Sequence, residues 1–204
     1  MPSYSYLTLQ NPATGIYKEK GSKFLAFAYP VASETDIKQR VGHLKKEYFD
    51  ARHHCFAWRL GIGKDHVRAF DDGEPTHSAG DPILGQIRSK KLTNVLIVVV
   101  RYFGGVKLGV GGLAEAYRAA AEDALRNGSI VEIEVSETMS LQLDYDILSD
   151  LMKVIKNLNC TIVEQHFGED GNLKINVPLR QKEKLLGKLT AWSGLGKKIK
   201  WKID

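Results

Sequence analysis

The sequence has little cysteine and no long apolar run. Its two cysteines, Cys55 and Cys160, lie far apart and form no C-x-x-C motif, so neither a disulfide framework nor a cysteine zinc site is predicted. The longest aliphatic run, VLIVVV at 95–100, is far too short to cross a bilayer. The start, MPSYSYLTLQ, lacks the basic and apolar regions of a secretory signal. We therefore expect a soluble protein of the reducing cytoplasm, with no membrane partner.

An excess of acidic residues is also missing. The 204 residues include 29 Lys and Arg against 24 Asp and Glu, which gives a net charge of +5. A hydrophobic fraction of 43% and a charged fraction of 26% are ordinary for a globular protein of one large or two small domains. The basic balance slightly favours an anionic partner such as RNA.

The first part of the chain alternates strand and helix patterns. Residues 4–31 predict strands separated by turns near residues 11–12 and 21–22, and a helix capped by Ser33 follows. CFAWRLG and VRAF predict two further strands, and a short helix follows them. NVLIVVVRYF is a continuous β-branched run, so it predicts a central strand buried on both faces. A long helix with an alanine-rich stripe then ends at Asn127-Gly128.

The pattern restarts beyond Gly128. A linker strand precedes a strand, a helix, a hairpin with its turn centred on Gly171, a second helix and the final strand in KKIKWKID. This order is βαββαβ, the split βαβ or ferredoxin-like plan. We therefore predict an α+β protein of two domains, residues 1–134 and residues 135–204.

The stretch RYFGGVKLGVGG, residues 101–112, joins the predicted central strand to the long helix. Gly109, Gly111 and Ala114 match the dinucleotide pattern G-x-G-x-x-A, but they lie too far beyond the strand, so NAD and FAD are not expected. No Gly-Lys-Ser/Thr triplet of a P-loop occurs there. No cofactor is therefore predicted.

A less specific phosphate site is compatible with the same stretch. Gly111 and Gly112 are predicted to open a helix, whose first N–H groups and dipole favour an anion. The alternative is that the glycines serve chain reversal or close packing. The candidate anion-binding residues are Arg101, Gly104, Gly105, Lys107, Gly109, Gly111 and Gly112.

The stretch DDGEPTHSAGDP, residues 71–82, is rich in carboxylates, which suggests acid/base chemistry or a metal. No known metal-ligand spacing is met, so no metal site is predicted. The alternative is a polar turn in which Thr76, Ser78 or Asp81 caps the next helix. The candidate acidic cluster, of undetermined role, comprises His54, Asp71, Asp72 and Glu74.

Adjacent residues of a strand point to opposite faces, which limits the histidines beside this cluster. His53 and His54 are neighbours in a predicted strand, so only one of them can join a site. Cys55 follows in the same apolar strand and is predicted to pack as a small hydrophobe rather than to act as a nucleophile.

The C-terminal segment is basic, with eight basic residues against two acidic ones between Arg180 and Asp204. The strand period of two sends Lys198, Lys200 and Lys202 to one face, which is predicted to be the open face of the second domain. There they are candidates for contact with a nucleic-acid backbone. The alternative is that lysines on an edge strand prevent aggregation.

Three segments together resemble a known family. The run GDPILGQIRSKKLTNVLIVVVRYFGGVKLG, from Gly80 to Gly109, resembles the signature of the IMPACT family, and ARHHCFAW and DDGEP match its other characteristic segments. The two-domain layout is similar to that of bacterial members. The positions that match the family motifs are His54, Asp71, Asp72, Gly73, Glu74, Arg101, Gly104, Gly105 and Gly109.

The resemblance implies a fold for each domain. The first is expected to share the α/β sandwich of domain two of small-subunit ribosomal protein five, and the second to be ferredoxin-like, as in the C-terminal domains of elongation factor G. Eukaryotic members of the family, which carry an additional N-terminal domain, compete for the activator of the kinase that phosphorylates initiation factor 2. The resemblance therefore implies a context in translation, and it implies no reaction.

Two functions follow as hypotheses. The first is a non-enzymatic cytosolic factor that binds RNA, ribosome or a translation-associated protein. The second is an enzyme or phosphometabolite-binding protein that uses the glycine-rich loop with Asp71, Asp72 and Glu74. A concave pocket where these carboxylates converge with Arg101 favours the second, and carboxylates that point into solvent or helix caps count against it.

Overall fold

The computed structural model describes residues 4–62, 66–168 and 170–204. The chain separates into two compact units. The first unit is Tyr6–Ile133, and the second unit is Glu134–Asp204 together with the chain up to Ser5. Within the described ranges, no helix is long and apolar enough to span a membrane.

The first unit is built on a five-stranded antiparallel sheet. Its strands are β2 (Ala13–Glu19), β3 (Ser22–Pro30), β4 (His53–Leu60), β5 (His66–Phe70) and β6 (Val95–Tyr102), in the order β2-β3-β6-β4-β5. Strand β6 is therefore central, and its residues 95–100 are fully buried. This confirms the prediction made from its unbroken β-branched run.

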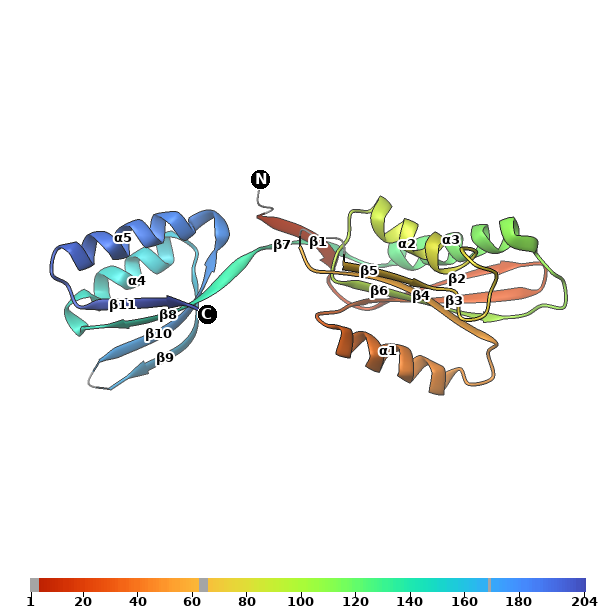
Figure 1. The fold of residues 1–204 in the computed structure, drawn as a ribbon, viewed down its shortest axis with the longest axis horizontal. Coiled ribbons are helices and arrows are strands. Elements are labelled where there is room, and N and C mark those ends of the chain that lie inside the picture. The colour runs from red at the N-terminus through yellow and green to blue at the C-terminus, as the bar shows by residue number, and fades with distance from the viewer. Residues whose placement is uncertain (1–3, 63–65, 169) are drawn as a thin grey trace. The chain divides into compact units, whose positions relative to one another are not determined.

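Helices cover both faces of this sheet, with α2 (Gly80–Ser89) and α3 (Gly109–Asn127) on one face and α1 (Glu34–Glu47) on the other (Figure 1). The strand period of two divides β6 between the two cores. Val95, Ile97 and Val99 pack with α2 and α3, whereas Leu96 and Val98 pack with α1. Each of these apolar side chains contributes about 1.5–3 kcal/mol to the stability of the fold when it is fully buried. Both faces of β6 therefore stabilise the first unit.

Helix ends follow from local chemistry. Ser33 caps α1, as predicted, because its Oγ accepts a hydrogen bond from the Asp36 N–H at 3.2 Å. Helix α3 ends at Asn127, and the next residue, Gly128, has φ −91°, outside the left-handed region. A Cβ at Gly128 would lie 2.9 Å from Leu9 Cδ2 and 3.1 Å from Ala13 Cβ, so the absence of a side chain allows close packing of this residue against the two strands. The adjoining strands β1 (Ser5–Leu9) and β7 (Ile130–Glu134) form a two-stranded sheet.

The second unit has the element order βαββαβ that the hydrophobic pattern predicts. The elements are β8 (Ser136–Leu143), α4 (Leu148–Asn157), β9 (Thr161–Phe167), β10 (Gly171–Pro178), α5 (Lys182–Gly194) and β11 (Ile199–Ile203), with single 3-10 turns at Tyr145–Ile147 and Leu179–Gln181. The sheet order is β11-β8-β10-β9, and both helices cover one face (Figure 1). The predicted turn centre was wrong, because Gly171 is already the first residue of β10 and pairs with Phe167.

Candidate functional site

A cavity of about 450 Å³ lies in the first unit, and we call it the α3 pocket. Its walls are the residues around the start of β4, the segment 73–75, the end of β6 with the loop after it, and the start of α3. The polar side chains of its lining are Arg52, His53, Glu74, Arg101 and Lys107, and the apolar ones are Pro75, Phe103, Leu108, Val110 and Leu113.

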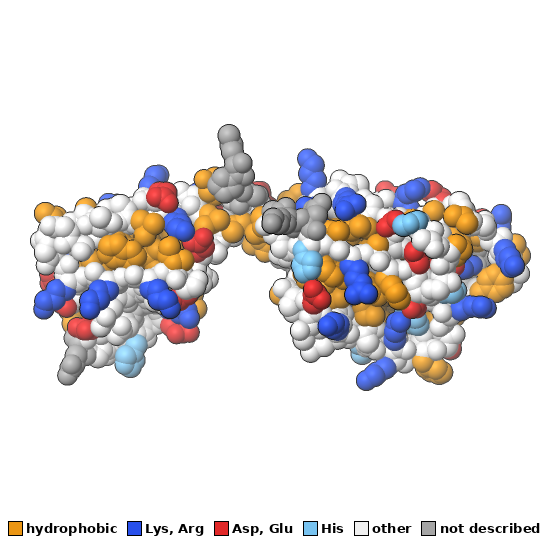
Figure 2. Space-filling view, viewed as in Figure 1, with side chains coloured by type: hydrophobic (Ala, Val, Ile, Leu, Met, Phe, Trp, Pro, Cys, Tyr) orange, Lys and Arg blue, Asp and Glu red, His pale blue; other side chains and the backbone are white. Residues whose placement is uncertain are grey.

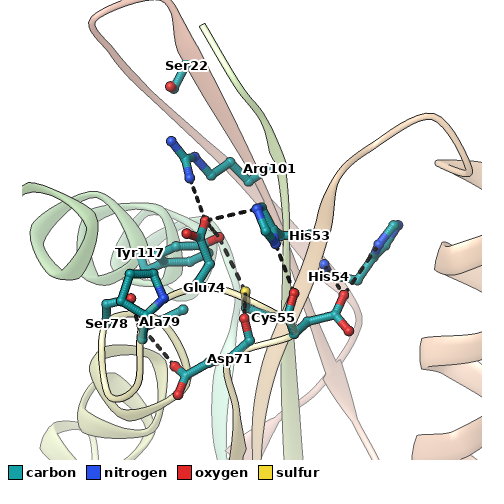
Figure 3. Close-up of polar contacts among 12 residues, drawn as sticks. Ser22, His53, His54, Cys55, Asp71, Glu74, Ser78, Ala79, Arg101 and Tyr117 are labelled. Atoms are coloured by element: carbon teal, nitrogen blue, oxygen red, sulfur yellow. Dashed lines mark hydrogen bonds and ion pairs between the residues drawn. The ribbon is translucent and has the colours of Figure 1, made fainter. Parts of the chain in front are cut away.

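A buried carboxylate organises the interior of this pocket. Glu74 Oε1 accepts hydrogen bonds from Arg101 Nη1 at 2.6 Å and from the Tyr117 hydroxyl at 2.8 Å (Figure 3). The Glu74 and Arg101 side chains are 4% and 6% exposed, so each charge depends on the other for its stabilisation. The Arg101 guanidinium also lies 5.5 Å from the centre of the Phe24 ring and 5.6 Å from that of Phe103.

Tyr117 and Cys55 extend the buried hydrogen-bond network. The Tyr117 ring packs edge-on against Phe24, with ring centres 5.1 Å apart. Cys55 Sγ lies 3.3 Å from the Tyr117 hydroxyl and 3.0 Å from the Asp71 carbonyl oxygen. Burial raises the pKa of both the Cys55 thiol and the Tyr117 hydroxyl far above their usual ranges. Cys55 is therefore a protonated, packed thiol and cannot supply a thiolate nucleophile at neutral pH.

His53, and not His54, is the histidine of the pocket. His53 Nδ1 lies 2.8 Å from the Asp72 carbonyl oxygen, which can only accept, so Nδ1 donates and Nε2 faces Glu74 Oε1 at 3.8 Å. His54 points to the other face of β4, where its Nε2 donates to the Tyr48 carbonyl oxygen at 3.1 Å (Figure 3). Strand alternation predicted that only one histidine could join the site. No signal along the chain indicates which face of the strand carries a pocket.

Two of the three predicted acids have structural roles. Asp71 Oδ1 accepts from the N–H groups of Ala79 at 3.0 Å and Gly80 at 2.8 Å, so it caps α2 from outside the helix. The expectation that Thr76, Ser78 or Asp81 would supply this cap was wrong, because the tight turn brings Asp71 back over the helix start. Asp72 accepts from the His54 N–H at 2.8 Å and from Lys45 Nζ at 3.1 Å.

Glu74 is consequently the one member of the predicted acidic cluster that lines the pocket. Within the described part of the chain, no group of three or more His, Cys, Asp or Glu side chains is arranged to hold a metal ion. The carboxylates therefore do not converge as the enzyme hypothesis requires, although Glu74, His53 and Arg101 do.

Three glycines of the loop are explained by backbone geometry. A Cβ at Gly104 would lie 1.9 Å from the carbonyl carbon of Gly21, where the chain after β6 crosses the β2–β3 turn. Gly105 and Gly109 have φ values of +87° and +72°, in the region that favours glycine. Chain reversal and close packing, the alternative to an anion site, therefore account for these three glycines. No ligand is needed to explain them.

The start of α3 differs from the prediction and remains open to an anion. The helix begins at Gly109, two residues before the predicted start. Its N-cap is Leu108, no described side chain caps it, and its first turn contains no acidic residue. A Cβ at Gly111 would meet no described atom within 4 Å, and its backbone is helical, so neither packing nor φ requires glycine there. Gly109 and Val110, at the start of α3, line the cavity, and no described carboxylate caps this helix start. Gly111 and Gly112, which were predicted to take part in anion binding, are not among the lining residues.

The electrostatic balance of the pocket is positive. Glu74 is neutralised by Arg101, and Arg52, Lys107 and the positive end of the α3 dipole remain. The Arg101 Nε is buried and has no hydrogen-bond partner among the described residues. Such an arrangement can bind an anion and orient it against the buried polar groups.

The predicted lysines of the second unit have a different setting. Lys200 and Lys202 lie on the edge strand β11, and Lys198 directly precedes it. Lys198 Nζ is 3.5 Å from an Asp144 carboxylate oxygen, and Lys202 Nζ is 3.9 Å from Asp204. On the face shown in Figure 2, Lys and Arg side chains are interspersed with acidic ones rather than gathered in one patch.

Sequence reasoning did not single out Tyr117, which contacts the lining residue Glu74, or the lining residues Arg52 and Phe103. Tyr117 lies in the alanine-rich stripe of α3, where periodicity predicts only its place on the apolar face, and its hydroxyl holds Glu74. Arg52 and Phe103 belong to the motifs ARHHCFAW and RYFGG, and both line the cavity. An arginine next to the histidine pair is the signal that could have indicated Arg52.

A known family model matches the part of the chain that forms this pocket. Residues 20–125 match the family model of the Impact N-terminal domain. That range includes every lining residue of the α3 pocket.

Similarity to individual proteins extends over most of the chain. "IMPACT family member YvyE" of Bacillus subtilis is 30% identical over 181 residues, which cover 88% of this chain and 82% of that protein. "IMPACT family member YigZ" of Escherichia coli is 30% identical over 191 residues, which cover 93% and 94%. A solved structure described as that of a hypothetical protein matches with a TM-score of 0.72, 28% identity and 97% coverage of both chains.

Proposed function

The chain belongs to the IMPACT family, and from this membership and the geometry of the α3 pocket we propose that it is a translation-associated factor that binds RNA through phosphate groups. The observation that carries the proposal is the uncapped start of α3, which lines the same cavity as Arg52 and Lys107. Free N–H groups, a helix dipole and two cations are the features that recognise phosphate in proteins.

The folds of the two units support the same context. We infer that the second unit is ferredoxin-like, because its order βαββαβ and its antiparallel sheet order β11-β8-β10-β9 fit that plan. For the first unit we infer the sandwich of domain two of small-subunit ribosomal protein five. Both folds occur in proteins that contact RNA or ribosomes, and this support is an analogy of fold.

The test is RNA binding as a function of salt. A labelled single-stranded RNA should be retained at low salt, and Lys107→Glu should weaken retention at least tenfold, because it places a carboxylate beside the free N–H groups of α3. The slope of log affinity against log salt should also fall by about 0.7 for each phosphate that the variant no longer binds. Lys38→Glu, on the exposed side of α1 across the sheet, makes the same charge change and is the matched control. Equal reductions in the two variants would assign the effect to net charge and contradict the proposal.

The lysines of the second unit provide a comparison arm in the same experiment. We expect the triple variant Lys198→Ala, Lys200→Ala and Lys202→Ala to lower the slope by less than roughly 2, the value for three fully bound phosphates at about 0.7 each. The reason is that Lys198 and Lys202 lie next to acidic side chains.

A second candidate function is an enzyme or phosphometabolite-binding protein. The observation that favours it is the convergence of His53, Glu74 and Arg101 inside one cavity. The result that would distinguish it is turnover of a small phosphorylated compound by the wild-type protein. Glu74→Gln should abolish this turnover, while the same variant still retains RNA.

A further inference from the structure

We propose that the α3 pocket receives one whole nucleotide of the bound RNA, with the phosphate at the start of α3 and the base and ribose inside the cavity. This inference rests on the proposed RNA binding and adds the chemical identity of the bound unit. It predicts recognition of an end or an extruded nucleotide rather than of the backbone alone.

The size of the cavity is the first argument. A phosphate group takes up the space of a few water molecules, each of about 30 Å³ in the liquid. A cavity of about 450 Å³ would therefore remain mostly empty if it received a phosphate alone. Cavities of a few hundred cubic ångströms are the ones that bury most of a small organic molecule.

The division of the lining is the second argument. The lining combines cationic groups, at Lys107, Arg52 and the α3 start, with the apolar side chains of Phe103, Leu108 and Val110. Phe103 is 48% exposed and Val110 is 58% exposed, so part of this apolar surface is open to a ligand. A ligand that combines an anionic group with a flat ring matches both kinds of group, because an aromatic ring stacks on the π-face of any base.

The buried polar groups are the third argument. Arg101 is 5% exposed, lines the cavity, and has an Nε without a partner in the described residues. Glu74, which also lines the cavity, is an acceptor. An apolar ligand would leave the Arg101 Nε–H unpaired at a cost, whereas ribose hydroxyls and base edges offer acceptors for it and donors for Glu74. Phosphate, flat ring and paired donor and acceptor groups together define a nucleotide.

The experiment is competition for the full-length protein between labelled RNA and small phosphates. The competitors are the four nucleoside 5′-monophosphates, ribose 5-phosphate and inorganic phosphate. At least one nucleoside monophosphate should displace the RNA at a concentration at least tenfold below that of ribose 5-phosphate. Phe103→Ala should remove this preference, so that the nucleoside monophosphates and ribose 5-phosphate displace the RNA at similar concentrations. Phe49→Ala, which removes a ring that is 82% exposed at the end of α1, is the matched control.

The outcomes separate the two proposals. If RNA is retained but ribose 5-phosphate or inorganic phosphate competes as well as any nucleotide, the nucleotide assignment is overturned and the proposed function stands. Calorimetric titration with the same nucleotides covers the case in which RNA is not retained. Nucleotide binding that depends on Phe103 would then overturn the RNA proposal and support the ligand assigned to the pocket, and no heat of binding would overturn both.

Discussion

At the scale of single residues, Glu74 and Arg101 matter most for the pocket. Both are buried, and the pair is joined by a hydrogen bond of 2.6 Å. Breaking a buried ion pair leaves an uncompensated charge in a low-dielectric site, which costs far more than the intact pair contributes. The stability of the protein should therefore fall when either Glu74 or Arg101 is replaced alone, and it should fall less when both are replaced together.

Arg101→Ala is accordingly expected to lower the free energy of unfolding by about 3–5 kcal/mol. The double variant Arg101→Leu with Glu74→Leu should recover part of this loss, because it removes both charges and keeps apolar volume. Urea titration followed by circular dichroism measures both. Arg52→Ala, which removes an exposed arginine from the same pocket, is the control. A single variant as stable as the control would show that the pair carries no buried charge.

His54 gives the protein a stability that depends on pH. Burial lowers the pKa of its imidazole below the usual 6.5, and the nearby Asp72 carboxylate opposes this shift in part. The unfolded chain therefore binds a proton at a higher pH than the folded protein does, so protonation favours unfolding. The stability that comes from keeping His54 neutral is fully present above pH 6.5, and it is lost as the pH falls through the folded-state pKa.

We expect the urea midpoint to fall between pH 7.5 and pH 5.5 and the fall to be smaller in His54→Gln. His43→Gln, at an exposed position of α1, serves as the control substitution. A fall of the same size in wild type and His54→Gln would assign the pH dependence to other groups.

At the scale of elements, much of the fold is legible in the sequence. The unbroken run of β6 and the apolar spacing of α1 and α3 depend on local periodicity, and their elements occur where periodicity places them. The pocket depends on long-range geometry instead. The cap of α2 by Asp71 arises from a turn, and the choice of His53 over His54 arises from which face of the sheet α3 covers. Neither can be derived from spacing along the chain.

The connection between β6 and α3 shows two kinds of glycine. Gly104→Ala should severely destabilise the first unit, because its Cβ would overlap the Gly21 backbone, which cannot move aside without opening the β2–β3 turn. Gly111→Ala should instead stabilise the protein by about 0.5–1 kcal/mol, since it lies in an open, helical position.

Thermal unfolding monitored by circular dichroism measures the two effects, and each variant is the control for the other. The explanation from close approach fails if Gly104→Ala unfolds at the wild-type temperature.

At the scale of the whole molecule, the chain consists of two units with separate hydrophobic cores. Every described residue of the α3 pocket belongs to the first unit. The second unit has its own core around Leu151, Ile175, Leu185 and Leu189, each fully buried. Binding at the pocket and folding of the second unit should therefore be separable.

Leu151→Ala is expected to destabilise the second unit by about 2–5 kcal/mol, because it leaves a cavity in a packed core. In calorimetry, one part of the unfolding transition should move to lower temperature. The pocket should still bind the proposed nucleotide ligand at temperatures between the two transitions. Loss of that binding together with the second unit would show that the units do not fold separately.

The buried contacts around the pocket form a closed circuit. Arg101 contacts Glu74 and the Phe24 ring, Phe24 packs on Tyr117, and Tyr117 donates back to Glu74. Each of these four side chains is held by two of the others, so none can change rotamer alone. The conformational entropy of the interior is thus lost when the protein folds and not when a ligand arrives. Ligand binding should therefore order only the exposed side chains at the mouth of the pocket. Substitutions of these side chains should change the dissociation rate of the ligand more than its association rate.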